Sequence, residues 1–286
     1  MILRPVSAVV AVLTAFPAFA QTTPEPTAAT EEVPQDVRAI YDALLLPQVI
    51  EVIGTEGAAH GEDLAQTIFG GRPVPQDWTD VVTSIYDPAH MEEEVLASLA
   101  EDLGNENTAA VLAFLQAEPG RSLTALELDA REAMMDEEVE QEAKEEAAVA
   151  VFQNAPRLEL LRRYAEANDI IEMNVAGTMN NNVAYLTGLL DGGALAGDMT
   201  ESDILADVST QEPQIRAQTE EWAYSFLLKA YEPASDPDIE ALIAFSETEP
   251  GQALNRAVFE AFDERFTEIS RALGLAAARY MTTDEI

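Results

Sequence analysis

Outside its carboxylates, this chain has few residues that could do chemistry. It contains two histidines, His60 and His90, two lysines, Lys144 and Lys229, and no cysteine. Without cysteine, thiolate nucleophiles, disulfides and cysteine-ligated metal sites are excluded. No G-x-S-x-G elbow, S-x-x-K pair, P-loop or G-x-G-x-x-G loop occurs in the sequence. The sequence therefore predicts no catalytic residue of these kinds and no nucleotide cofactor.

Histidine and glutamate come together once at a spacing that suits a metal. His90, Glu93 and Glu94 stand at i, i+3 and i+4, which places three ligand-type side chains on one helical face. The alternative is the acidic first turn of a helix that begins after Asp87-Pro88, where the helix dipole favours carboxylates. We favour this second interpretation, because no H-E-x-x-H or H-x-x-E-H pattern is completed. His60 is likewise interpreted as a surface or satisfied core histidine. The prediction is no metal and no cofactor.

Carboxylates dominate the charge of the chain. Asp and Glu number 53 against 15 Lys and Arg, so the formal net charge is -38 and the pI is about 4.1. This excess repels nucleic acids and anionic lipids, and it attracts positively charged partners. Two carboxylates could also act as acid and base on an envelope polymer. Chance pairs are plentiful, however, and two tryptophans and seven tyrosines offer few platforms for sugars.

An asparagine-rich run, residues 180–182, is the most unusual polar feature. Asparagines are poor helix formers, yet the apolar residues on both sides predict a helix that passes through the body of the fold. In such a helix Asn181 and Tyr185 lie one turn apart, and Asn174 lies two turns before Asn181. With Glu172 they form a candidate polar binding cluster that could line an inter-helix cleft. The alternative is an exposed surface or loop patch. Buried, mutually hydrogen-bonded side chains would support the cluster.

The elements that must position these residues are predicted to be helices throughout. From Val37 onward, apolar residues recur at i, i+3, i+4 and i+7, which predicts an all-α fold. Ser235 and Thr200 are typical helix-capping residues, and Glu132 to Val151 reads as a solvated helix between two halves. The last segment predicts one long amphipathic helix beginning near Pro250-Gly251. Its apolar stripe consists of Leu254, Val258, Phe259, Phe262, Phe266, Ile269, Leu273 and Tyr280.

The chain resembles itself along its length. Residues 110–123 align without gaps to residues 241–254, and seven of the fourteen positions are identical. Earlier echoes in the same order are Gly70-Gly71 with Gly192-Gly193, Trp78 with Trp222, and Tyr86-Asp87-Pro88-Ala89 with Tyr231-Glu232-Pro233-Ala234. The pattern predicts an internal duplication, a helical bundle of two related halves at 36–140 and 141–286, with an insertion around His90 to Gly104. The alternative is convergent helix–turn–helix chemistry, since Pro-Gly breaks are common in helical proteins.

The second copy of the main echo, residues 241–254, also carries a family resemblance. The A-F-x-x-x-E-P-G-x-x-L element at residues 244–254, followed by the long Phe-rich helix, resembles the domain of unknown function 2059 family. The resemblance covers about Asp238 to Met281. It implies an all-helical, exported protein of proteobacterial type. The family carries no established reaction or ligand residues, so the resemblance implies none here.

The N-terminus predicts export. Arg4 precedes an apolar run from Val6 to Phe16, and Ala18-Phe19-Ala20 forms an A-x-A cleavage site. We expect a signal peptide over 1–20, cleavage after Ala20, a disordered leader over 21–35, and a periplasmic or secreted product. No later segment reaches 18 uninterrupted apolar residues, so no membrane span is expected after processing.

Taken together, these features predict a soluble, non-catalytic binding or interaction module of the cell envelope. Its partner would be an envelope protein, a basic peptide or a cell-wall fragment, and the sequence leaves its oligomeric state open. The alternative is a hydrolase of envelope polymers that depends on carboxylates or a divalent cation. A third interpretation is a structural or stress-related protein whose charge serves solubility.

Overall fold

The structure is a computed structural model that describes residues 33–195 and 199–282, apart from the side chains of residues 105, 106 and 282. This part of the chain contains twelve α-helices and no strand, which confirms the all-α prediction. The helices are α1 (Gln35–Ala43), α2 (Leu46–Phe69), α3 (Gln76–Ile85), α4 (Pro88–Asp102), α5 (Asn105–Leu115), α6 (Gly120–Ala133), α7 (Glu137–Gln153), α8 (Pro156–Ala167), α9 (Ile170–Asp191), α10 (Glu201–Ala230), α11 (Asp236–Ser246) and α12 (Glu249–Thr282).

The folded part starts slightly earlier than the sequence predicted. The expected signal peptide, 1–20, and most of the expected leader, 21–35, lie outside the described residues. At the end of that leader, Val33 packs against the main core and Gln35 is the first residue of α1. None of the described helices combines the length and the apolar character needed to cross a membrane.

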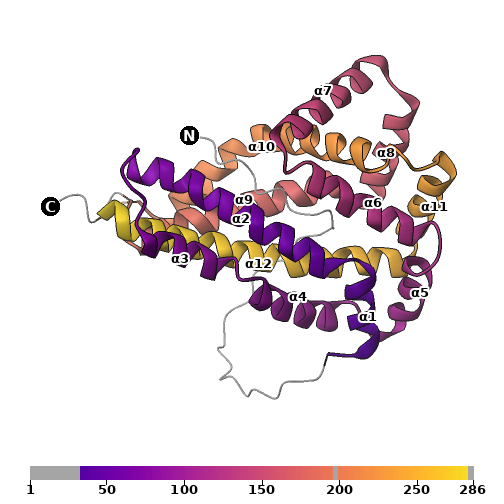
Figure 1. The fold of residues 1–286 in the computed structure, drawn as a ribbon, viewed down its shortest axis with the longest axis horizontal. Coiled ribbons are helices and arrows are strands. Elements are labelled where there is room, and N and C mark those ends of the chain that lie inside the picture. The colour runs from indigo at the N-terminus through magenta and orange to yellow at the C-terminus, as the bar shows by residue number, and fades with distance from the viewer. Residues whose placement is uncertain (1–32, 196–198, 283–286) are drawn as a thin grey trace.

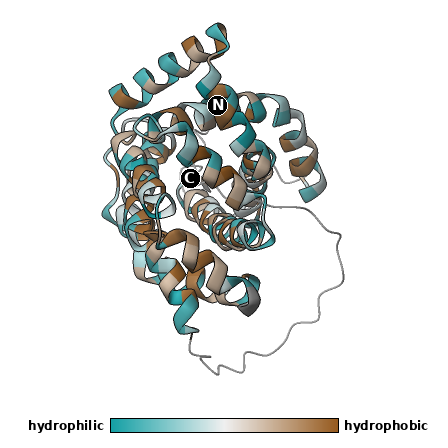
Figure 2. Ribbon diagram, turned by 90° about the vertical axis from the view of Figure 1, so that its right-hand side faces the viewer, coloured by the Kyte–Doolittle hydropathy of each residue, from teal (hydrophilic) through white to brown (hydrophobic). Residues whose placement is uncertain are grey.

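Helix α12 runs along the centre of the molecule (Figure 1), and other helices surround it when the molecule is turned by a right angle (Figure 2). Its most extensive contact is with α9, followed by α4. The predicted long helix and its apolar stripe are confirmed, because seven of the eight stripe residues are buried and Tyr280 is partly buried. Small residues on other faces are buried too, among them Ala253, Ala257 and Ala278. The helix is therefore enclosed on more sides than its stripe indicates.

Two predicted helix starts are confirmed as capping boxes. At α10, the Asp203 backbone N–H donates to Thr200 Oγ1 at 3.3 Å, and the Thr200 N–H donates to the Asp203 carboxylate at 2.9 Å. Ser235 and Asp238 make the same reciprocal pair at the start of α11. Each pair satisfies backbone donors that the first helical turn leaves free, a contribution of about 1 kcal/mol.

The two copies of the main sequence echo share a stacked aromatic pair and a close approach at the glycine. Phe114 of α5 and Phe245 of α11 stack on each other with ring centroids 4.0 Å apart and an interplanar angle of 1°. A Cβ atom at Gly120 would lie 2.2 Å from the Phe114 carbonyl oxygen, and one at Gly251 would lie 2.1 Å from the Phe245 carbonyl oxygen. Glycine is required at both breaks because the chain turns back closely on the preceding helix. Packing thus explains why these residues recur, and common origin stays a prediction.

The hydrophobic cores do not follow the predicted division into 36–140 and 141–286. The main cluster joins side chains of α1 to α5 with the stripe of α12. The second cluster joins Leu123 and Ala130 of α6 with side chains of α8, α10 and α11. Each stretch therefore places its last helix in the other stretch's core, and the proposed boundary at residue 140 falls inside α7.

Helix α7 corresponds to the solvated helix predicted over Glu132 to Val151, with shifted limits. The helix begins at Glu137 after the N-cap Asp136, and residues 132 and 133 belong to α6. It packs on α10 and buries Ala143 and Ala147, while its other residues are exposed or partly exposed. Figure 1 shows this helix at the top of the molecule.

Candidate functional site

The predicted polar cluster lies on α9, which is helical through all three asparagines, as expected. Glu172 is exposed and accepts two hydrogen bonds from Arg216 of α10, at 2.5 and 2.8 Å. The Asn174 side chain donates to the Ile170 carbonyl one turn earlier, at 2.7 Å. These two residues therefore have separate partners.

The other two cluster residues are partly buried in different surroundings. Asn181 Oδ1 is buried and has no hydrogen-bond partner among the described residues, and Tyr185 packs against the main core. Burial raises the pKa of Tyr185. No hydrogen bond joins any two of these four described side chains. Residues two apart on a helix point about 200° away from each other, so Glu172 and Asn174 cannot share a face. The role of the four residues in binding stays a prediction.

A neighbouring asparagine leads from α9 to a different site. Asn180 donates to Asp263 Oδ2 of α12 at 3.2 Å. The other carboxylate oxygen of Asp263, Oδ1, is buried without a hydrogen-bond partner among the described residues. Burial raises the pKa of Asp263, and the bond from Asn180 partly opposes that shift.

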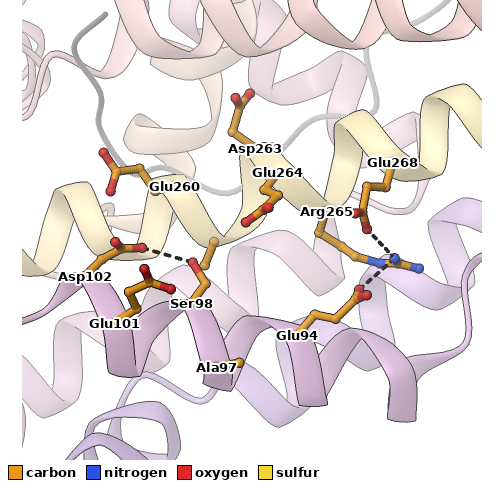
Figure 3. Close-up of a pocket in the computed structure, with 11 residues that line it drawn as sticks. Glu94, Ala97, Ser98, Glu101, Asp102, Glu260, Asp263, Glu264, Arg265 and Glu268 are labelled. Carbon is orange, nitrogen blue, oxygen red and sulfur yellow. Dashed lines mark hydrogen bonds and ion pairs between the residues drawn. The ribbon is translucent and has the colours of Figure 1, made fainter. Parts of the chain in front are cut away.

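Asp263 lines an acidic groove between α4 and α12 with a volume of about 630 Å³ (Figure 3). Buried apolar side chains of both helices, such as Leu99 and Phe262, belong to one core beneath it. Carboxylates four residues apart on α12 share the face that borders the groove. Seven carboxylate residues line it: Glu94, Glu101, Asp102, Glu260, Asp263, Glu264 and Glu268.

Arg265 neutralises one end of the groove. Of the described residues that line it, Arg265 alone carries a positive charge. Its side chain is almost fully buried, with Nη1 placed 2.6 Å from Glu94 and 3.0 Å from Glu268, while Nη2 donates to the Ile85 carbonyl at 3.1 Å. Figure 3 shows this group at one end of the groove and Glu101, Asp102 and Glu260 toward the other. The negative charge at the end with Glu101, Asp102 and Glu260 is therefore not compensated by Arg265.

The surroundings of the groove disfavour ionisation of two of its carboxyl groups, those of Glu260 and Glu264. Burial raises the pKa of Glu260, and the nearby Asp102 raises it further. Burial also raises the pKa of Glu264, with added repulsion from Glu268, Asp102 and other groove carboxylates. Like charges held close together in a partly desolvated site favour a proton or a cation. A positively charged group bound here would relieve that repulsion.

The side chains of His90, Glu93 and Glu94, for which the sequence favours an acidic first turn over a metal site, do not form one group. His90 Nε2 lies 3.1 Å from Glu94, which in turn pairs with Arg265, whereas Glu93 is exposed. Within residues 33–195 and 199–282, no group of three or more His, Asp or Glu side chains is placed to hold a metal ion. His60 is partly buried on α2, and burial lowers its pKa while Asp63 opposes the shift.

No family model, curated protein or solved structure matches this chain. The groove is therefore interpreted from its own geometry. Sequence reasoning missed it because Glu101 and Glu264 are far apart in the chain and belong to different helices. The only signal was the i, i+4, i+8 spacing of Glu260, Glu264 and Glu268, which is also typical of any solvent-exposed helix face.

Proposed function

We propose that this chain is a non-catalytic binding module whose acidic groove holds a positively charged, extended segment of a partner. The observation that carries the proposal is the concave surface between α4 and α12, where one arginine stands against seven carboxylates. Glu260, Glu264 and Glu268 rise about 6 Å from one to the next along α12. Side chains on one side of an extended peptide repeat at about 6.7 Å, so successive lysines or arginines can meet successive glutamates. This match favours a basic peptide or protein segment over a cell-wall fragment.

The alternative function is a carboxylate-dependent hydrolase. Such an enzyme needs one carboxyl group kept protonated beside another kept ionised. In the groove, the carboxyls whose pKa is shifted, those of Glu260, Asp263 and Glu264, all shift upward. This common direction supports binding of a cation more than division into an acid and a base.

The binding proposal is tested with a fluorescent lysine octapeptide and the mature chain, residues 21–286. We expect binding at low salt that weakens at high salt, because exposed charges are screened. Replacing Glu101, Glu260 and Glu264 together with glutamine should weaken binding roughly tenfold, since each exposed ion pair contributes about 0.2–1 kcal/mol. Fluorescence anisotropy measures the change.

The matched control removes the same net charge elsewhere. Glu138, Glu142 and Glu146 are exposed on α7, outside the groove, and replacing them with glutamine should leave affinity almost unchanged. Equal weakening by both triple variants would show that the peptide responds only to overall charge. That result, or no binding at low salt, would reject the proposal.

We also propose that the chain meets its partner in the cell envelope. The support is the signal-peptide pattern from Arg4 to Ala20. In a bacterial host, N-terminal sequencing of the protein in the periplasmic extract should begin at Gln21. Full-length protein that begins at Met1 and stays in the cytoplasm would contradict export.

Finally, we propose that the two halves arose by duplication. The support is the collinear order of the sequence echoes, which runs from Gly70-Gly71 with Gly192-Gly193 to residues 110–123 with residues 241–254. The stretch proposed as an insertion, 90–104, makes up most of α4, one wall of the groove. On this proposal, the groove was acquired after the duplication.

A further inference from the structure

A second, smaller pocket lies beside the stacked Phe114 and Phe245 rings, with lining residues from α5, α6, α8, α11 and α12. Its volume is about 90 Å³. Most of its wall is apolar, with leucines from several helices and Val258 of α12. One carboxylate, that of Glu127 on α6, also lines it. This pocket is separate from the acidic groove, with which it shares no lining residue.

The two carboxylate oxygens of Glu127 differ in their hydrogen bonding. Its Oε1 accepts a hydrogen bond from the buried Tyr231 hydroxyl, which is also hydrogen-bonded to Tyr164. Its Oε2 has no hydrogen-bond partner among the described residues, and no lysine or arginine is found in the pocket wall. Glu127 is partly buried, and a carboxylate that is partly withdrawn from water is stabilised by a proton or a cation.

The amides of the pocket wall are already engaged. The Asn255 side chain donates to Asn168 Oδ1 at 2.5 Å, and Asn168 donates to the Tyr164 carbonyl at 2.9 Å. The other copy of the sequence echo has an apolar residue at the position of Glu127. If the register of the sequence echo is continued by four residues, Glu127 corresponds to Val258, which lines the same pocket. The carboxylate is therefore the one charged group among the described residues of a mostly apolar wall.

We propose that this pocket binds a small primary alkylammonium ion, with its nitrogen at Glu127 Oε2 and its alkyl chain against the two stacked rings. The carboxylate supplies the charge that an ammonium group needs, and the apolar wall accommodates methylenes. A cavity of about 150 Å³ admits benzene, so 90 Å³ corresponds to a ligand of about four non-hydrogen atoms. Propylammonium has that size.

The ionisation of Glu127 gives the site a pH dependence. Burial raises the pKa of Glu127 to about 7, although the hydrogen bond from Tyr231 opposes the shift. The titratable groups that face it are Tyr231, beyond the end of α10, and Tyr164 of α8; burial raises the pKa of both, so they stay neutral near pH 7. Propylammonium keeps its charge across this range, so affinity should rise roughly tenfold between pH 6 and pH 8 as the carboxylate ionises.

The experiment is an NMR titration of the mature chain with propylammonium at physiological salt. We expect saturable shifts of methyl groups in the pocket, such as those of Leu242 and Leu254, at about millimolar concentration. The neutral 1-propanol, of the same size, should bind at least about tenfold more weakly. Glu127→Gln should abolish the saturable shifts.

A second variant guards against an indirect effect of that substitution. Ser246→Leu introduces the residue found at the echo position, Leu115, and fills the pocket while leaving Glu127 in place. It too should abolish the shifts, whereas the exposed control Glu142→Gln should retain them. Absence of saturable binding, equal binding of 1-propanol, or binding that survives Glu127→Gln would overturn the proposal. The groove experiment changes neither Glu127 nor Ser246, so the two proposals can fail separately.

Discussion

Replacing Gly274 with alanine is expected to destabilise the protein by about 3 kcal/mol, although the same change normally stabilises a helix by about 1 kcal/mol. Gly274 lies on α12 where it crosses α9. A Cβ atom there would stand 2.1 Å from the Tyr185 carbonyl oxygen and 3.0 Å from the Leu189 nitrogen. Both atoms belong to the α9 backbone, which cannot turn aside as a flexible side chain can. The two helices must therefore separate, and the contacts of the longest interface are lost.

Urea unfolding followed by circular dichroism measures this loss. The facing residue provides an internal check, because a Cβ atom at Gly188 would stand 2.3 Å from the Arg271 carbonyl oxygen. Once Gly274→Ala has moved the helices apart, adding Gly188→Ala should cost less than it does alone. A more stable Gly274→Ala protein, or fully additive losses, would mean that the helices do not approach this closely.

The second large effect concerns pH. The pKa of Glu127 is raised from about 4.5 to about 7, so between these values the folded state holds a proton that the unfolded state has released. The contribution of this group is therefore fully present below about pH 4.5 and is lost as the pH rises through 7. The loss amounts to about 3 kcal/mol. Glu127→Gln, which stays neutral, should be more stable than the wild type above pH 7 by about that amount.

The comparison requires a control because a chain of charge -38 also loses stability through general repulsion as its carboxylates ionise. Glu142 is exposed on α7, and Glu142→Gln removes one charge without altering a buried group. Its unfolding free energy should follow the wild-type pH dependence closely. If Glu127→Gln follows the same curve as Glu142→Gln, the pKa of Glu127 is not raised by burial.

Local patterns predicted the helices well. The capping sequences at Thr200 and Ser235 specify their own hydrogen bonds within four residues, so no distant contact is needed to read them. The apolar stripe of α12 has the same advantage, since its period alone identifies the face that must be covered. Helix α7 begins where Asp136 caps it. This cap is hard to recognise in the sequence because it lies within an acidic run of strong helix formers.

Sites built from two distant helices could not be predicted in this way. Among 53 acidic residues, nothing in the sequence shows that Glu101 lies across a groove from Glu260. Glu127 is equally inconspicuous, because its surroundings come from five helices. The candidate cluster on α9 shows a related limit. The sequence predicted its helix, but the partner of Glu172 is Arg216, on a neighbouring helix whose placement only the fold determines.

The central place of α12 has a consequence for biosynthesis. The helix that completes the core around Ile40 and Leu99 is translated last, and it begins 147 residues after the end of α4. Ribosomes add about 5–20 residues per second. The apolar faces of the first helices therefore stay exposed for on the order of ten seconds before α12 can pack against them. We therefore expect the nascent chain to bind chaperones during that interval, and we expect a truncated product that lacks α12 to be degraded.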